Sequence, residues 1–148
     1  MSSLKRKGFA TLLLVGLSLT LVACANNSGI EAVKSEGSGL TVLVNQTSDA
    51  GDSALLVGKL DINSSGCIGV LSDDGYHPVA FPSGTAFQES RLSIPGSDLI
   101  YQLGDLVVLT GGNGNVTVEM RKASGNCLDS SIGSIFFSSE AELNSATS

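Results

Sequence analysis

The chain has 148 residues and carries 14 acidic against 8 basic side chains, which gives a net charge of −6 at pH 7. This length suits one small domain with a single modest hydrophobic core. The acidic balance argues against nucleic acid as a partner, because proteins bind nucleic acids mainly through lysine and arginine side chains that neutralise phosphates.

The N-terminus has the layout of a secretory signal peptide. Lys5, Arg6 and Lys7 form a basic start, and nearly every residue from 8 to 23 is apolar or small. A basic start, a short apolar block and a small residue at its end are typical of a segment that directs export and is then removed. The block is shorter than the roughly 20 apolar residues that a membrane-spanning helix needs.

The apolar block ends in LVAC, residues 21–24, which resembles the lipobox of bacterial lipoproteins. The resemblance covers residues 1–24 only. It implies that residues 1–23 are a signal peptide, that Cys24 is the first mature residue, and that its thiol carries a diacylglycerol with palmitate-like chains. An uncleaved signal anchor, or a plain secretory signal with a cysteine near its end, are the alternatives.

Lipidation would place the protein in the cell envelope, outside the cytoplasm. Two acyl chains hold a protein stably at a membrane, whereas one chain holds it only reversibly. The resemblance therefore predicts attachment through Cys24 to the outer face of the cell membrane or to an outer membrane. Ala25, in place of an aspartate, favours the outer membrane if the host has two membranes.

Two cysteines, Cys67 and Cys127, remain after Cys24 is modified. An exported protein folds in an oxidising compartment, and two thiols allow only one pairing. We therefore predict a Cys67–Cys127 disulfide. Two reduced buried thiols or two metal ligands are the alternatives, although a zinc site needs further ligands.

The rest of the chain divides into three parts by composition. Residues 25–39 are small, polar and rich in glycine, so residues 24–39 are expected to be a lipidated cysteine and a flexible tether. Residues 40–138 are expected to form one β domain. Residues 139–148 are expected to be a C-terminal tail, with a weak helical pattern at 140–143.

Alternating apolar and polar positions dominate the β domain. In 54–62, for example, Leu56, Leu60 and Ile62 face one way while Lys59 and Asp61 face the other. Similar signals predict strands at 40–44, 67–71, 76–81, 106–110, 116–121 and 134–138.

Turn residues separate these segments: DDG at 73–75 predicts a turn, and GGNGN at 111–115 predicts a hairpin turn. Short strands at this spacing favour an all-β fold. We expect a small, partly open barrel of the oligonucleotide/oligosaccharide-binding (OB) type, with a β-sandwich as the alternative.

Few residues suggest catalytic chemistry. His77 is the only histidine, and an exposed histidine at a strand start is its simplest interpretation. Asp73 and Asp74 suit a turn better than a site, since short acidic side chains hydrogen-bond their own backbone. Asp49 and Asp52 are a weak calcium candidate. The sequence therefore predicts no catalytic, cofactor or metal site.

Aromatic residues also limit the binding roles. Sugar and single-strand nucleic-acid sites depend on exposed rings for stacking. The chain has no tryptophan, and its phenylalanines lie in apolar contexts. Tyr76 and Tyr101 are the only candidates for an exposed ring.

A second, looser resemblance covers about half of the chain. GCIGVLSDDGYHPVAFPSGT at 66–85 and YQLGDLVVLTGG at 101–112 resemble a pattern in small exported actinobacterial proteins of unassigned function. We expect a non-enzymatic envelope lipoprotein that binds a protein partner or a small ligand. The alternative is a carboxylate-dependent hydrolase of cell-wall or glycan substrates, for which the sequence singles out no carboxylate pair.

Overall fold

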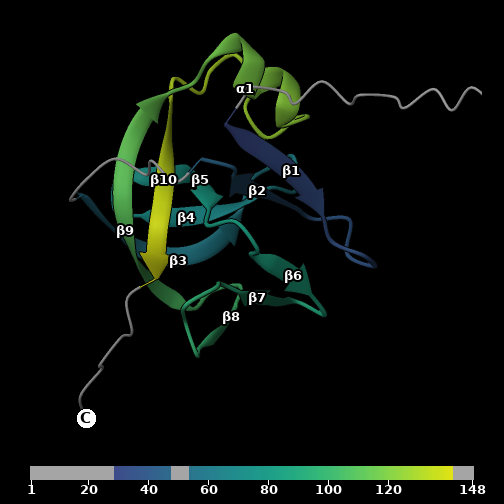
Figure 1. Cartoon of the computed structure of the whole chain (residues 1–148), viewed down its shortest axis with the longest axis vertical. Coiled ribbons are helices and arrows are strands. Elements are labelled where there is room, and N and C mark those ends of the chain that lie inside the picture. The colour runs from purple at the N-terminus through teal and green to yellow at the C-terminus, as the bar shows by residue number, and fades with distance from the viewer. Residues whose placement is uncertain (1–28, 48–53, 142–148) are drawn as a thin grey trace, which may run out of the picture.

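The computed structural model describes residues 29–47 and 54–141, which form a β domain with one short helix. The strands are β1 (Ile30–Lys34), β2 (Thr41–Asn45), β3 (Ala54–Ile62), β4 (Ile68–Ser72), β5 (Gly75–Phe81), β6 (Ala86–Gln88), β7 (Arg91–Ser93), β8 (Ile100–Gln102), β9 (Leu106–Asn115) and β10 (Ser134–Ala141), and the helix is α1 (Val118–Ala123). Figure 1 shows the curved β9 and β10 crossing β3, β4 and β5.

Five of these strands close into a barrel. β3, β4, β5, β10 and β9 follow one another around the ring, and pairing of β9 with β3 completes it. β9 returns beside β3, so β9, β3, β4 and β5 form a Greek key. The prediction of a small β barrel is confirmed. The ring is closed rather than partly open, and a sandwich does not form.

Strands β1 and β2 extend the sheet beyond the barrel. β2 runs parallel to the end of β5, and β1 pairs with β2 over five residues. The predicted tether is therefore wrong over residues 30–34. The signal for β1 is weak because only Ile30, which is 3% exposed, and the small Ala32 contribute to its buried face.

Residues 116–121, predicted as a strand, lead instead into helix α1. Thr117 caps this helix by accepting a hydrogen bond from the backbone N–H of Met120. Glu119 lies in the first turn and Arg121 in the last, which suits the helix dipole. These end signals outweigh the alternation of Val116, Val118 and Met120, which is too short to decide between strand and helix.

The glycine-rich segment 111–115 is not a hairpin turn but the second half of β9. A Cβ atom on Gly111 would lie 1.9 Å from the carbonyl oxygen of Phe137 on β10. Glycine is therefore required at this position by close approach of two strands. β10 also runs to Ala141, past the predicted start of the C-terminal tail, and residues 142–148 lie outside the described residues.

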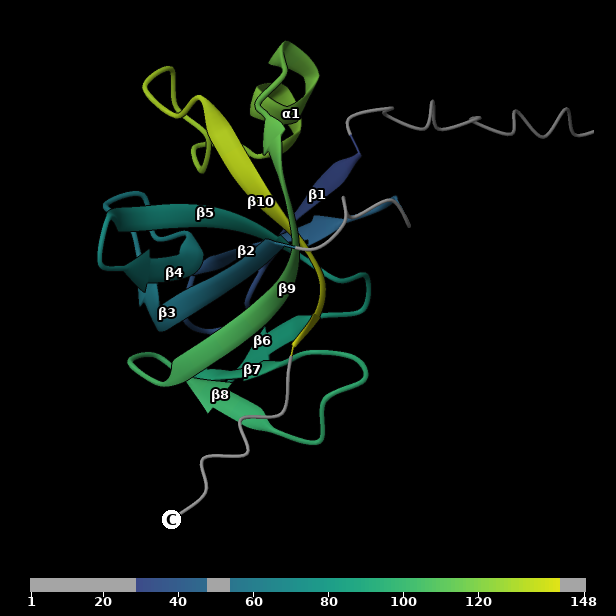
Figure 2. The same cartoon turned by 90° about the vertical axis from the view of Figure 1, so that its left-hand side faces the viewer.

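Strands β6, β7 and β8 form a separate three-stranded sheet that the sequence did not predict. Each has three residues, which is too short for a periodic signal. Figure 2 shows this sheet at one end of the molecule, with α1 at the other. Phe87, Leu92 and Tyr101 pack from it into the barrel interior, so it caps that end.

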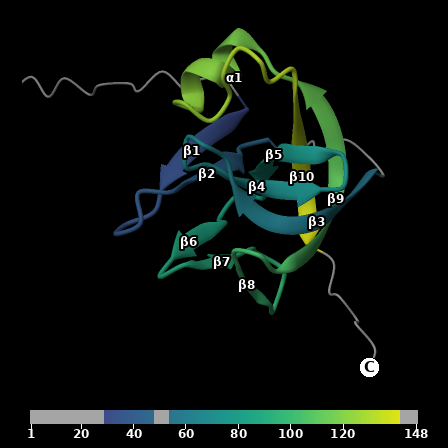
Figure 3. The ribbon, with the colours of Figure 1, turned by 180° about the vertical axis from the view of Figure 1, so that it is seen from behind.

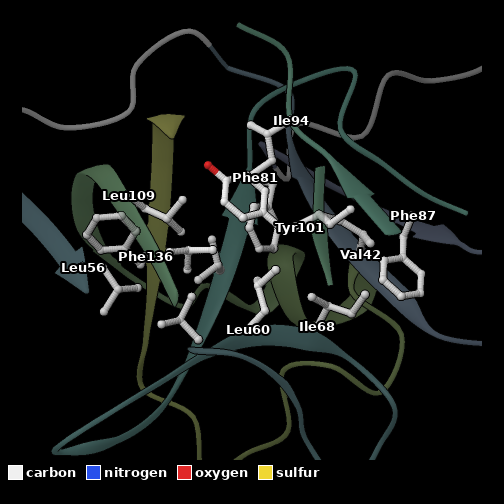
Figure 4. Packing of buried hydrophobic residues seen from close by; sticks show 14 of the residues in the cluster. Val42, Leu56, Leu60, Ile68, Phe81, Phe87, Ile94, Tyr101, Leu109 and Phe136 are labelled. Carbon is white, nitrogen blue, oxygen red and sulfur yellow. The ribbon is translucent and has the colours of Figure 1, made fainter. Parts of the chain in front are cut away.

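Two hydrophobic clusters hold the fold together. The first fills the barrel, and Figure 4 shows side chains from β3, β5, β9 and β10 meeting those of the three-stranded sheet. The second lies outside the barrel wall, where β1, β2 and α1 gather (Figure 3). β2 contributes to both, because Val42 and Val44 belong to the first cluster and Leu43 to the second.

The predicted disulfide is confirmed. Cys67 and Cys127 are bonded, with their Cα atoms 5.5 Å apart, and both are buried in the second cluster. The bond joins the residue before β4 to the loop after α1. No helix among residues 29–47 and 54–141 is long and apolar enough to cross a membrane.

Removal of the disulfide should destabilise the domain. The bond closes a loop with a sequence separation of 60, so replacing both cysteines with alanine should lower the free energy of unfolding by about 2–4 kcal/mol. Urea unfolding measures this loss, and reduction of the wild-type chain should reproduce it. A mass that stays unchanged when the unfolded chain is reduced would contradict the bond.

Gly111→Ala should also destabilise the barrel, by about 2 kcal/mol, because the added methyl group forces β9 and β10 apart. Gly133→Ala is the matched control, since its Cβ would meet nothing within 4 Å. The control should change the free energy of unfolding by less than about 0.5 kcal/mol. Equal effects of the two variants in urea unfolding would contradict the close approach.

Candidate functional site

A hollow of about 290 Å³ lies where β3 and β9 approach the β4–β5 turn. We call it the mouth hollow, and it is lined by Leu55, Leu56, Val57, Ser72, Asp74, His77, Asn113 and Phe136. Leu56 and Phe136 belong to the barrel core, so the hollow has an apolar floor beneath polar walls. Mouths of barrels are common places for ligands to bind.

The strand register explains why polar residues gather there. Side chains two residues apart on a strand point to the same face. Ser72 follows the buried Val70 by two residues, and His77 precedes the buried Val79 by two. Both side chains therefore point into the barrel. They lie at the end of the barrel opposite the capping sheet.

Asn113 reaches the hollow in the same way, because it follows the buried Gly111 by two residues on β9. Neither Ser72 nor Asn113 was predicted from the sequence as a site residue. Each is a polar residue that takes the next inward-facing position after the last buried residue of its strand, and this pattern could have indicated them.

Ser72, Asp74 and His77 form one hydrogen-bonded cluster at the β4–β5 turn. The Nε2 atom of His77 lies 2.8 Å from the Ser72 hydroxyl and 2.9 Å from the Asp74 carboxylate. The Ser72 hydroxyl also donates to the same carboxylate. The predicted turn at 73–75 is thus confirmed, and the cluster fastens its two ends together.

This cluster is not a catalytic triad, although it contains the three residue types of one. In a triad the acid holds Nδ1 of the histidine while Nε2 takes the proton of the serine. Here both Ser72 and Asp74 contact the same nitrogen of His77. The imidazole therefore does not link acid to nucleophile, and the arrangement suits binding rather than nucleophilic attack.

The cluster gives the rim of the hollow a negative charge. Hydrogen bonds from Ser72, and then from His77, lower the pKa of the Asp74 carboxyl from 3.8 to about 2. Asp74 is thus ionised at any physiological pH. No lysine or arginine is found among the lining residues that the structure describes.

Neither candidate tyrosine offers a free ring. Tyr101 is 4% exposed and lies in the barrel core. Tyr76 donates a hydrogen bond from its hydroxyl to the carbonyl oxygen of Cys67, at 2.8 Å. Burial, followed by the charge of Asp61, raises the pKa of Tyr76, so this donor stays protonated.

Two other hollows have different linings. One, of about 330 Å³, is lined by amides, hydroxyls and Pro82, and the other, of about 210 Å³, lies beside the disulfide. The described residues that line each of these three hollows include at most one carboxylate. Among the described residues, no group of three or more His, Cys, Asp or Glu side chains is placed to hold a metal. Asp49, Asp52 and Cys24 lie outside the described residues.

Comparison of the chain with protein-family models, with curated proteins and with solved structures gives no significant match. The class to which the protein belongs is therefore defined by its topology. It is a small closed five-stranded Greek-key barrel with one capped end and a polar hollow at the ends of β3, β4, β5, β9 and β10.

The charge of Asp74 should be visible in the pH dependence of stability. The folded chain binds the Asp74 proton more weakly than the unfolded chain, so ionised Asp74 stabilises the fold fully only above about pH 5. This stabilisation is lost as the pH falls toward 2. The difference in Tm between the wild type and Asp74→Asn should therefore shrink between about pH 5 and about pH 2.

Asp98→Asn is the matched control, because Asp98 is exposed and does not line the hollow. A difference in Tm for Asp74→Asn that stays constant over the whole pH range would show that the cluster does not hold the carboxylate in its ionised form.

Proposed function

We propose that the protein is an envelope lipoprotein that is held to a membrane by a lipid on Cys24 and binds a protein partner or small ligand at the mouth hollow. The observation that carries the anchor is the LVAC sequence at the end of the apolar block. The disulfide supports export, because such bonds form and persist in oxidising compartments outside the cytoplasm.

The start of the domain sets how far it can lie from the membrane. β1 begins at Ile30, six residues after Cys24. Even a fully extended chain of that length spans only about 20 Å. The chain from Cys24 onward carries 5 basic and 14 acidic residues, a net charge of −9, so its surface is not attracted to anionic headgroups. The lipid therefore supplies the attachment.

The mouth hollow favours binding over catalysis. It combines an apolar floor with a few polar groups, which is the usual make-up of a binding site. The hydrolase alternative requires two carboxylates on opposite sides of a scissile bond. Asp74 is the single carboxylate among the described residues of the lining, and its lowered pKa makes it a poor proton donor.

Intact-mass analysis of the protein extracted from its native host tests the anchor. We expect a chain that begins at Cys24 and carries a diacylglycerol. Cys24→Ala should keep residues 1–23 and lack the lipid, whereas Ala25→Ser should be processed normally. An unmodified Cys24 in the wild-type protein would contradict the proposal.

A further inference from the structure

Among the described residues, one edge of strand β3 has no pairing partner beside the mouth hollow. Its ladder with β4 runs from Ile62↔Ile68 to Lys59↔Leu71 and stops there. Its ladder with β9, on the other side, continues to Ala54. Residues 55–57 are thus paired on one side only among the described residues, and they line the hollow on the other.

The hydrogen bonds of Leu60 show to which side the backbone N–H and C=O groups of β3 point. Its N–H donates to Asp105 at 2.9 Å, and its carbonyl accepts from Gly104 at 2.7 Å, so both groups point toward the β9 side. Successive residues of a strand direct these groups to opposite sides. Val57 and Leu55, three and five residues earlier, therefore direct their N–H and C=O groups toward the hollow.

The side chains beside this edge are apolar and uncovered. Leu55 is 61% exposed and Val57 is 48% exposed. They belong to the outward face of the barrel, where Leu71 on β4 and Leu106 on β9 are also exposed. A strand placed against the edge would cover part of this face with its own alternate side chains.

The opposite wall is acidic. Asp74 lines the hollow, and the exposed Asp73 precedes it in the same turn. The closest basic residue along β3 is Lys59, which is paired with Leu71 and does not line the hollow. Together with the acidic balance of the whole chain, this wall attracts a cation.

We infer that the mouth hollow binds an extended peptide segment of an envelope protein, which adds as a strand to the edge of β3 at Leu55 and Val57 and places a lysine or arginine beside Asp74. Strand addition of this kind obtains affinity from backbone hydrogen bonds and specificity from side-chain pockets. About three residues of the peptide lie against this edge, since each strand residue advances about 3.3 Å. The inference rests on the proposed binding function and names the class of its partner.

Titration calorimetry with short peptides tests this inference, with the full chain in nonionic detergent. The probe is Ac-TKVKT-NH2, and its acidic counterpart Ac-TEVET-NH2 is the charge control. We expect the basic peptide to bind at least about tenfold more tightly than the acidic one. A form of the basic peptide methylated on its backbone nitrogens should bind about tenfold more weakly, because it lacks the donors for β3.

Two variants of the chain locate the site. Asp74→Asn should weaken binding of the basic peptide about fivefold, while Asp98→Asn, which makes the same change in net charge outside the hollow, should change it less than about twofold. Val57→Pro removes an N–H that faces the hollow and leaves the β9 ladder intact, so it should weaken binding while the far-ultraviolet circular dichroism stays unchanged.

Amide hydrogen exchange gives a direct readout. The basic peptide should slow exchange at Leu55 and Val57, and the methylated form should not. The inference is overturned if no peptide binds, if the acidic peptide binds equally well, or if binding leaves exchange at these two amides unchanged. Such a result, with a lipid found on Cys24, would reject the peptide site and leave the anchor in place.

Discussion

The fold depends on the burial of β5 on both of its faces. Val79, Ala80 and Phe81 are completely buried, and they alternate between the two hydrophobic clusters. Val79 and Phe81 fill the barrel, while Ala80 lies against the second cluster. β5 also pairs with β4, β10 and β2, so the closed ring and its outer layer share one strand.

This arrangement also explains where the hollow lies. β5 pairs with β10 only at Val79 and Ala80, near its C-terminal end. Its N-terminal half pairs with β4 alone and carries His77. β5 and β10 are therefore paired beside the capping sheet but not at the other end of the ring, where the polar ends of the strands line the hollow.

Strands that are long and regular could be predicted from the sequence. The alternation in 54–62 predicted β3 with its observed bounds, because nine residues give a clear period. The predictions were wrong where a tertiary contact overrides the local conformational preference of a residue. Gly111 looks like a turn residue, and only the approach of Phe137 explains its place in a strand. The three-residue strands β6, β7 and β8 carry no period at all.

The site was predictable only in pieces. Asp74 and His77 were visible as a turn and a lone histidine, and the disulfide followed from counting thiols. Asp74 and His77 line one hollow with Asn113 and Phe136 only because the barrel closes, which brings together segments far apart in the sequence. The edge of β3 that is unpaired among the described residues likewise depends on where its pairing with β4 stops, and no residue pattern in 54–62 indicates that point.

The disulfide has a consequence for how the folded domain responds to proteolysis. Cleavage of one peptide bond anywhere between Cys67 and Cys127 divides the chain into two fragments. The disulfide keeps those fragments covalently joined. The later fragment, which includes β10, would then stay in place as long as the bridge is intact. Separation of the two fragments would thus require a reductant as well as a protease.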